Sequence, residues 1–200
     1  PPCILLEKTL AGENRCGIAG DILPPADPSY KGQLDMEHVS AAALGPDLEI
    51  TVRMKTITSE WNPPYGYDHV YFNVFFSLPG GEGRDYLPKL GWCPEGFRFN
   101  YGFLFYGWGV VSYSARDSAP DSYGTPLPEK IEQTVDASIR TIRFRFPREL
   151  FGESGDYSGL KIFISTWDGY LGKFHEVLPQ RRDWTFSALG ATPPEKIPKI

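Results

Sequence analysis

Aromatic residues in turn-forming, polar segments are the side chains of this sequence best suited to chemistry. Six residues share that setting: Trp61, Tyr65, Tyr67, Trp92, Tyr106 and Trp108. Flat amphipathic rings stack on the apolar C–H faces of sugars, while nearby Asp, Asn, Gln or Arg side chains hydrogen-bond the sugar hydroxyls. With 5 tryptophans and 11 tyrosines in 200 residues, the chain is rich in such rings. These six residues are therefore the candidate ligand-binding set. The alternative for each is a structural role, as we expect for Trp167 and Trp184.

Three aspartates form a second candidate site. Asp21, Asp27 and Asp35 lie among prolines and glycines, on a segment that can curl. Carboxylate oxygens on such a loop suit calcium better than a transition metal. Asp beside Pro or Gly is also an ordinary way to begin a turn, and the spacing is not that of an EF-hand. Both interpretations, a structural calcium site and simple turn chemistry, stay open.

Familiar catalytic signatures are absent from the sequence. It contains no GxSxG elbow, no HExxH, no Walker lysine loop and no GxGxxG. The three histidines, His38, His69 and His175, each lie alone in their segments. A glycosidase needs a matched pair of carboxylates, and nothing singles out such a pair among the 25 acidic residues. We therefore expect a chain without catalytic residues.

Charge and hydropathy exclude two classes of partner. The net charge is -5, and no basic run of the kind that binds nucleic acid occurs. No apolar run approaches the roughly 20 residues of a membrane-spanning helix.

The chain opens with Pro1 rather than Met, so we expect a processed product or a piece of a longer polypeptide. Cys3, Cys16 and Cys93 lack CxxC spacing; a Cys3 to Cys16 disulfide and three free thiols are both open.

The elements that must position these residues are short strands. Residues 48–55 and 70–78 alternate apolar and polar side chains, which predicts two strands flanking the proline-stiffened loop 61–67. Other strand-like segments are residues 36–43, 138–147, 160–167 and 184–186, together with residues 97–114, for which one strand and a bent pair of strands are both open. A single helical turn is expected at residues 147–151. Roughly eight short strands with almost no helical period predict a single all-β domain, an antiparallel β-sandwich of jelly-roll or immunoglobulin-like type.

Scattered motifs add a family resemblance. In order they are Gly20-Asp21, Asp27 with Tyr30, Gly32, Leu34-Asp35, Trp61-Asn62-Pro63-Pro64, Gly66, Gly107-Trp108, Thr166-Trp167-Asp168 and Pro198-Lys199-Ile200. Over residues 18–200 this order resembles the glucodextranase C-terminal, DOMON-like β-sandwich domains, which are similar to family 9 carbohydrate-binding modules. Residues 1–17 would then be a lead-in or linker remnant, and an extra strand at the short apolar segment of residues 3–6 is also open. The resemblance implies a non-catalytic accessory module of a secreted glycoside hydrolase acting on α-glucans such as starch, glycogen or dextran.

The resemblance also bears on cofactors. It would place a calcium role on Asp21, Asp27 and Asp35, although this loop reads DILPPAD, with fewer acids and glycines than denser members of the family. Other DOMON-like domains hold haem through Met and His. Here Met54 lies on the apolar face of its predicted strand, and no haem is expected. The tryptophan pair that holds sugar in family 9 modules is not assigned to residues of this chain.

Two functions follow as hypotheses. The first is a carbohydrate-binding module that stacks an α-glucan of starch or dextran type on loop aromatics, with an oligo- or polysaccharide and an adjoining glycoside hydrolase catalytic domain as its partners. The alternative is a structural accessory β-sandwich that packs on a catalytic domain and has no sugar affinity of its own. Both imply a secreted, periplasmic or cell-surface location and neither involves nucleic acid.

Overall fold

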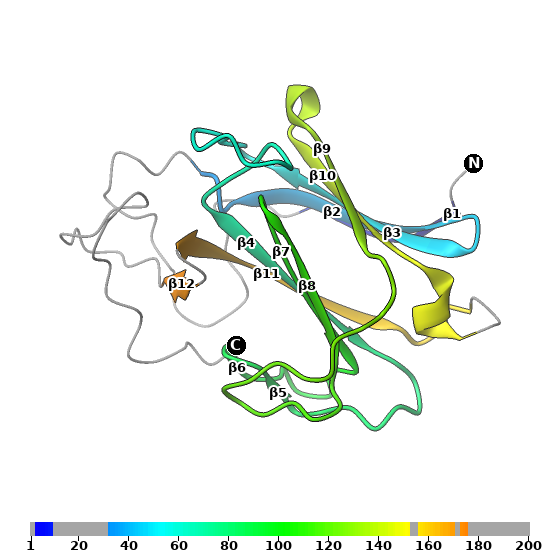
Figure 1. Ribbon diagram of the computed structural model, residues 1–200. Helices are drawn as coiled ribbons and strands as arrows, with labels where there is room; N and C mark the ends of the chain where they lie inside the picture. Colours follow the sequence, from blue (N-terminus) through cyan, green and yellow to red (C-terminus); the bar gives the residue numbers. More distant parts are fainter. Residues whose placement is uncertain (1–2, 10–31, 153–155, 171–172, 176–200) are drawn as a thin grey trace.

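Two antiparallel sheets packed face to face form the molecule (Figure 1). A computed structural model describes residues 3–9, 32–152, 156–170 and 173–175. The first sheet contains, in spatial order, β1 (Cys3–Thr9), β2 (Met36–Leu44), β3 (Asp47–Met54), β10 (Thr141–Phe146) and β9 (Glu132–Asp136). The second contains β12 (Lys173–His175), β11 (Lys161–Tyr170), β4 (Val70–Ser77), β7 (Tyr101–Tyr106) and β8 (Gly109–Ser114). The predicted single-domain β-sandwich is confirmed.

The strands predicted within the described residues agree with the structure, and residues 97–114 adopt the bent pair rather than one strand. Residues 97–114 form two strands, β7 and β8, because the chain turns at Gly107 and Trp108. The helical turn expected at residues 147–151 is the 3-10 helix η2 (Arg148–Phe151), and a second one, η1 (Ala137–Ile139), precedes β10. Strands β9 and β12 and the small pair β5 (Tyr86–Leu87) and β6 (Gly91–Trp92) have no counterpart in the sequence prediction. Residues 184–186 lie outside the described residues.

The core between the sheets is made by the alternating faces that the sequence indicates. On β3 the side chains of Leu48, Ile50 and Val52 are fully buried, whereas Arg53 on the opposite face is exposed. Aromatic rings from both sheets meet in this layer, as where Phe105 stacks on Phe144 with ring centroids 4.1 Å apart. Because a buried aromatic side chain removes a large apolar area from water, these rings dominate the cohesion of the sandwich.

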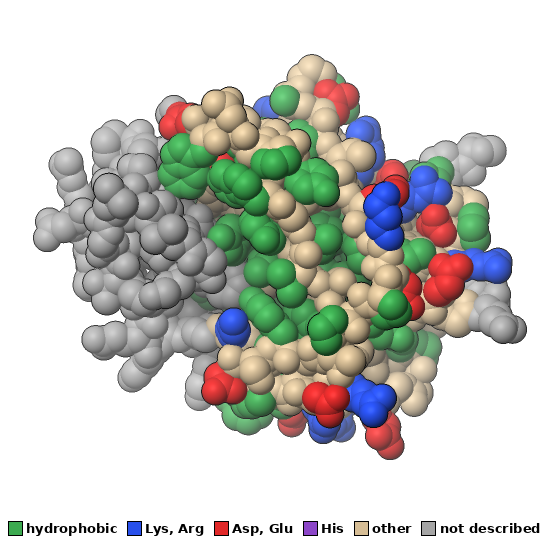
Figure 2. Space-filling model, viewed as in Figure 1, with side chains coloured by type: hydrophobic (Ala, Val, Ile, Leu, Met, Phe, Trp, Pro, Cys, Tyr) green, Lys and Arg blue, Asp and Glu red, His purple; other side chains and the backbone are tan. Residues whose placement is uncertain are grey.

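The second sheet is also apolar on its outer face. Tyr71, Phe75, Leu104 and Trp167 lie there and pack with the segment that carries β5 and β6. Figure 2 shows hydrophobic side chains gathered over β4, β7 and β8 on this side of the molecule. Strand β4 is consequently buried on both faces along nearly its whole length. The structural role expected for Trp167 agrees with its burial there.

Candidate functional site

Three of the six candidate aromatic residues are exposed on two adjoining loops. Trp61 and Tyr65 lie in the loop of residues 55–69, between β3 and β4, and Trp108 lies in the turn between β7 and β8 (Figure 1). Their exposed fractions are 37%, 39% and 46%. The ring centroids of Trp61 and Trp108 are 6.3 Å apart and the rings are tilted by 36°. We call these three residues the aromatic platform.

Long-range strand pairing brings the two loops together. In the pairing of β4 with β7, Phe72 lies opposite Phe105, so the residues just before β4 lie beside those just after β7. The backbone N–H of Tyr65 donates a hydrogen bond to the carbonyl oxygen of Gly107, at 3.0 Å. A Cβ added at Gly107 would lie 1.8 Å from the carbonyl oxygen of Tyr67. Glycine is therefore required where the loops touch.

The end of the 55–69 loop holds Trp61 in place. A carboxylate oxygen of the buried residue Asp68 accepts a hydrogen bond from the backbone N–H of Trp61, at 2.7 Å. The backbone N–H of Asp68 donates in turn to the carbonyl oxygen of Thr58, at 2.8 Å. The ring of His69, which is also buried, lies 4.0 Å from the indole of Trp61. The indole of Trp61 thus packs against a buried ring, and its backbone is held by a hydrogen bond.

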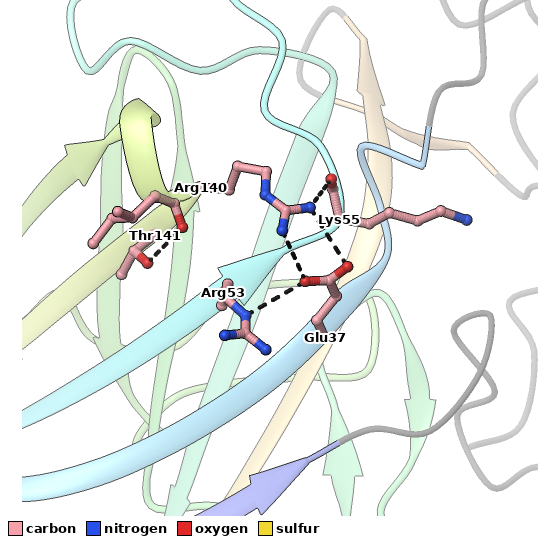
Figure 3. Close-up of polar contacts among 6 residues, drawn as sticks. Glu37, Arg53, Lys55, Arg140 and Thr141 are labelled. Atoms are coloured by element: carbon pink, nitrogen blue, oxygen red, sulfur yellow. Dashed lines mark hydrogen bonds and ion pairs between the residues drawn. The ribbon is translucent and has the colours of Figure 1, made fainter.

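The start of the same loop is held by a charged cluster on the first sheet (Figure 3). The guanidinium of Arg140 donates to the carbonyl oxygen of Lys55, at 2.6 Å, and lies 3.4 Å from the carboxylate of Glu37. Glu37 also lies 3.4 Å from Arg53 on the neighbouring strand β3. Exposed ion pairs of this kind contribute little to stability by themselves. Their structural effect is to fix the point where the loop leaves the sheet.

Tyr67 differs from its expected place, because the structure buries it completely instead of exposing its ring. Its hydroxyl donates to the side-chain oxygen of Gln133, at 2.7 Å. Burial raises the pKa of Tyr67 well above its usual value, with smaller contributions from Tyr65 and Tyr106. The hydroxyl consequently stays protonated and acts as a donor. Tyr67 supports the loop from below, and sequence reasoning missed its partner Gln133.

The other two candidate residues lie elsewhere. Trp92 is 57% exposed on β6, at the end of the molecule opposite the 55–69 loop (Figure 1). Tyr106 is half-buried, and its ring lies 5.4 Å from Tyr71 on the outer face of the second sheet. The structure therefore brings Trp61, Tyr65 and Trp108 together and separates Trp92 from them.

The candidate calcium ligands are only partly described. Asp35 is buried, and its carboxylate lies 3.3 Å from the ammonium group of Lys55. Asp21 and Asp27 lie outside the described residues, as does Cys16 of the candidate disulfide. Within the part of the chain that the structure describes, no group of three or more His, Cys, Asp or Glu side chains is placed to hold a metal ion. Calcium binding by the three aspartates stays a prediction.

Comparison with known proteins identifies the family. No helix among the described residues is long and apolar enough to cross a membrane. No curated protein matches the sequence significantly. The family described as the C-terminal, SLH-like binding module of glucodextranase matches residues 19–200, which is nearly the whole chain. That match confirms the family resemblance drawn from the sequence motifs. The chain belongs to the family of C-terminal, SLH-like binding modules of glucodextranase.

Proposed function

We propose that this chain is the non-catalytic carbohydrate-binding module of a secreted glycoside hydrolase, and that it binds α-glucans of the starch or dextran type on the aromatic platform. Membership of a family of binding modules supports the accessory role and the attachment to a hydrolase. The observation that carries the proposal is the pair of exposed indoles, Trp61 and Trp108, that two separate loops bring within 6.3 Å of each other.

The spacing of the two indoles defines how a sugar binds. A sugar ring held between two aromatic faces needs van der Waals contact on both sides, which requires about 7 to 8 Å between the faces. The centroids of Trp61 and Trp108 are only 6.3 Å apart. A sugar therefore does not enter between them. The two rings act side by side, and each supplies a stacking surface to one face of the glycan.

The tilt between the rings favours a curved chain. Successive sugars of an α-linked glucan change direction along the chain, whereas a flat β-linked chain presents successive rings to one plane. Indoles inclined by 36° match the changing ring directions of an α-linked glucan better than the single plane of a flat β-linked chain. The tilt adds to the family relationship with glucodextranase, which is the main reason for proposing α-glucans, and it counts against flat, cellulose-like chains.

Titration of the chain with oligosaccharides tests the proposal. We expect tryptophan fluorescence to respond to maltooligosaccharides or isomaltooligosaccharides, and to respond less or not at all to cellooligosaccharides and xylooligosaccharides. Trp61→Ala should abolish most of the response, while Trp92→Ala should keep it. A chain that responds to no glycan would contradict the proposal and leave the alternative, a structural domain that packs on a catalytic domain.

A further inference from the structure

We propose that Gln133 is a positioning residue that sets the placement of Trp61 relative to Trp108. Gln133 lies on β9, an edge strand of the first sheet, whereas Trp108 belongs to the second sheet. The side chain of Gln133 forms no hydrogen bond with either indole. It acts through its bonds to Tyr67, Tyr106 and Gly109, in the two loops that carry Trp61 and Trp108. The predicted effect on glycan affinity rests on the proposed function, but the effect on the two rings does not.

The amide of Gln133 joins both loops. Its oxygen accepts the hydrogen bond from the hydroxyl of Tyr67, at 2.7 Å. Its nitrogen donates to the carbonyl oxygens of Tyr106, at 3.1 Å, and of Gly109, at 2.9 Å. Gln133 is only 6% exposed, so water does not replace these partners easily. One side chain thus binds the end of the Trp61 loop and both sides of the Trp108 turn.

The hydrogen bonds of Gln133 lie where they can fix the turn that carries Trp108. The carbonyls of Tyr106 and Gly109 lie on either side of Gly107 and Trp108, so both ends of the turn are fixed by the same amide nitrogen. The backbones of the two loops are in direct contact at Gly107, with no side chain between them. A shift of the turn therefore changes the distance and tilt between Trp108 and Trp61.

Glutamine is the residue type that this position needs. The three partners require one acceptor and two donors on a planar group, and a primary amide supplies both. A carboxylate has no donor and would face the carbonyl oxygens of Tyr106 and Gly109. A methionine fills a similar space but removes all three hydrogen bonds, including the one to the buried Tyr67 hydroxyl, and leaving that hydroxyl without its acceptor is costly. These differences provide variants with distinct outcomes.

The first test compares Gln133→Met with Thr141→Val in the full chain. Thr141 is another buried polar residue of the first sheet, and among the described residues its hydroxyl donates only to the carbonyl oxygen of Ile139, at 3.2 Å. Two indoles in close contact give an exciton couplet in circular dichroism, which reports their relative orientation directly. We expect Gln133→Met to reduce this couplet strongly and to weaken binding of a maltooligosaccharide by about tenfold, as loss of a buried hydrogen bond would give. Thr141→Val should change neither.

A pH profile separates positioning from simple packing. In Gln133→Glu, burial and the two carbonyl oxygens disfavour the ionised carboxyl and raise its pKa. The introduced group therefore fits best below the pKa that it has in the unfolded chain, and the fit is lost as pH rises through its folded-state pKa. We expect the couplet of this variant to recover on acidification, whereas that of Gln133→Met does not.

The outcomes distinguish this proposal from the proposed function. A folded Gln133→Met chain with an unchanged couplet would overturn the positioning role, even if its melting temperature fell. If Gln133→Met does not fold, Tyr67→Phe, which removes a single hydrogen bond, replaces it. A reduced couplet in Tyr67→Phe supports the positioning role, and an unchanged couplet overturns it. If the wild-type chain binds no glycan while the couplet still depends on Gln133, the proposed function fails and the positioning role stands.

Discussion

Replacing Trp108 by alanine tests the aromatic platform most directly. A tryptophan side chain has up to about 250 Å² of surface. At 46% exposure, roughly 100 Å² of Trp108 is open to a ligand. Since a glycan that lies on one face covers about half of that area, the contact buries roughly 50 Å² on the protein side and a similar area on the sugar. At about 25 cal/mol per Å², this corresponds to about 2.5 kcal/mol at most.

Part of that stabilisation is lost in ordering the glycan, so we expect Trp108→Ala to weaken binding by about 1.4 kcal/mol, or tenfold. Isothermal titration calorimetry with a maltooligosaccharide measures this without relying on the fluorescence of the removed indole. Because Trp108 lies exposed in a turn, the melting temperature should change little.

Trp92→Ala is the matched control for this prediction. Trp92 is more exposed than Trp108, at 57%, but it lies at the opposite end of the molecule. If exposure alone decided which indoles bind glycan, Trp92→Ala would cause the larger loss of affinity. We expect it to cause none. Equal losses in the two variants, or a loss only with Trp92→Ala, would refute the assignment of the site to the Trp61 and Trp108 loops.

Three further measurements probe the structure. Gly107→Ala should lower the free energy of unfolding by about 1 to 3 kcal/mol in urea denaturation, because its Cβ has no room beside Tyr67, whereas the nearest atom to a Cβ at Gly109 is 3.5 Å away and Gly109→Ala should be tolerated. Burial raises the pKa of Cys93 to about 11, so alkylation by iodoacetamide should be slow at neutral pH and accelerate toward pH 11; rapid labelling at pH 7 would contradict this. If Asp21, Asp27 and Asp35 bind calcium, a chelator should lower the melting temperature of the wild-type chain but not that of Asp21→Asn, and an equal response would count against the site.

Local patterns in the sequence were sufficient to predict the sandwich. Alternation in residues 48–54 and 70–77 reports directly which side chains face the core, because successive residues of a strand point to opposite faces. Strand β9 escaped prediction since its sequence, EQTVD, is short and polar and reads like a surface loop. The segment of residues 97–114 does not distinguish one strand from a bent pair, because aromatic residues continue through its turn.

The composition of the site depended on contacts that no local pattern encodes. Trp61 and Trp108 meet only because β4 and β7 pair with Phe72 opposite Phe105. Tyr67 has the same loop setting as Tyr65 in the sequence, yet a buried partner 66 residues away turns its ring inward. Gln133 gives no signal of its own, because a glutamine on a polar five-residue strand is usually a solvated residue.

The way the platform is anchored argues for a binding role over a purely structural one. Ordering a flexible side chain on binding costs about 0.5 to 1.5 kcal/mol, and a shallow surface with few contacts cannot offset much of that. Here the indole of Trp61 already packs against the ring of His69. The Trp61 N–H donates to Asp68 and the Gln133 amide donates to Tyr106, so both loops are fixed. A domain that only packs on a neighbour gains little from holding exposed indoles at a set tilt. If these indoles instead pack on an adjoining catalytic domain, a soluble α-glucan should leave their fluorescence in the linked protein unchanged, whereas the proposed function requires that the glycan changes it.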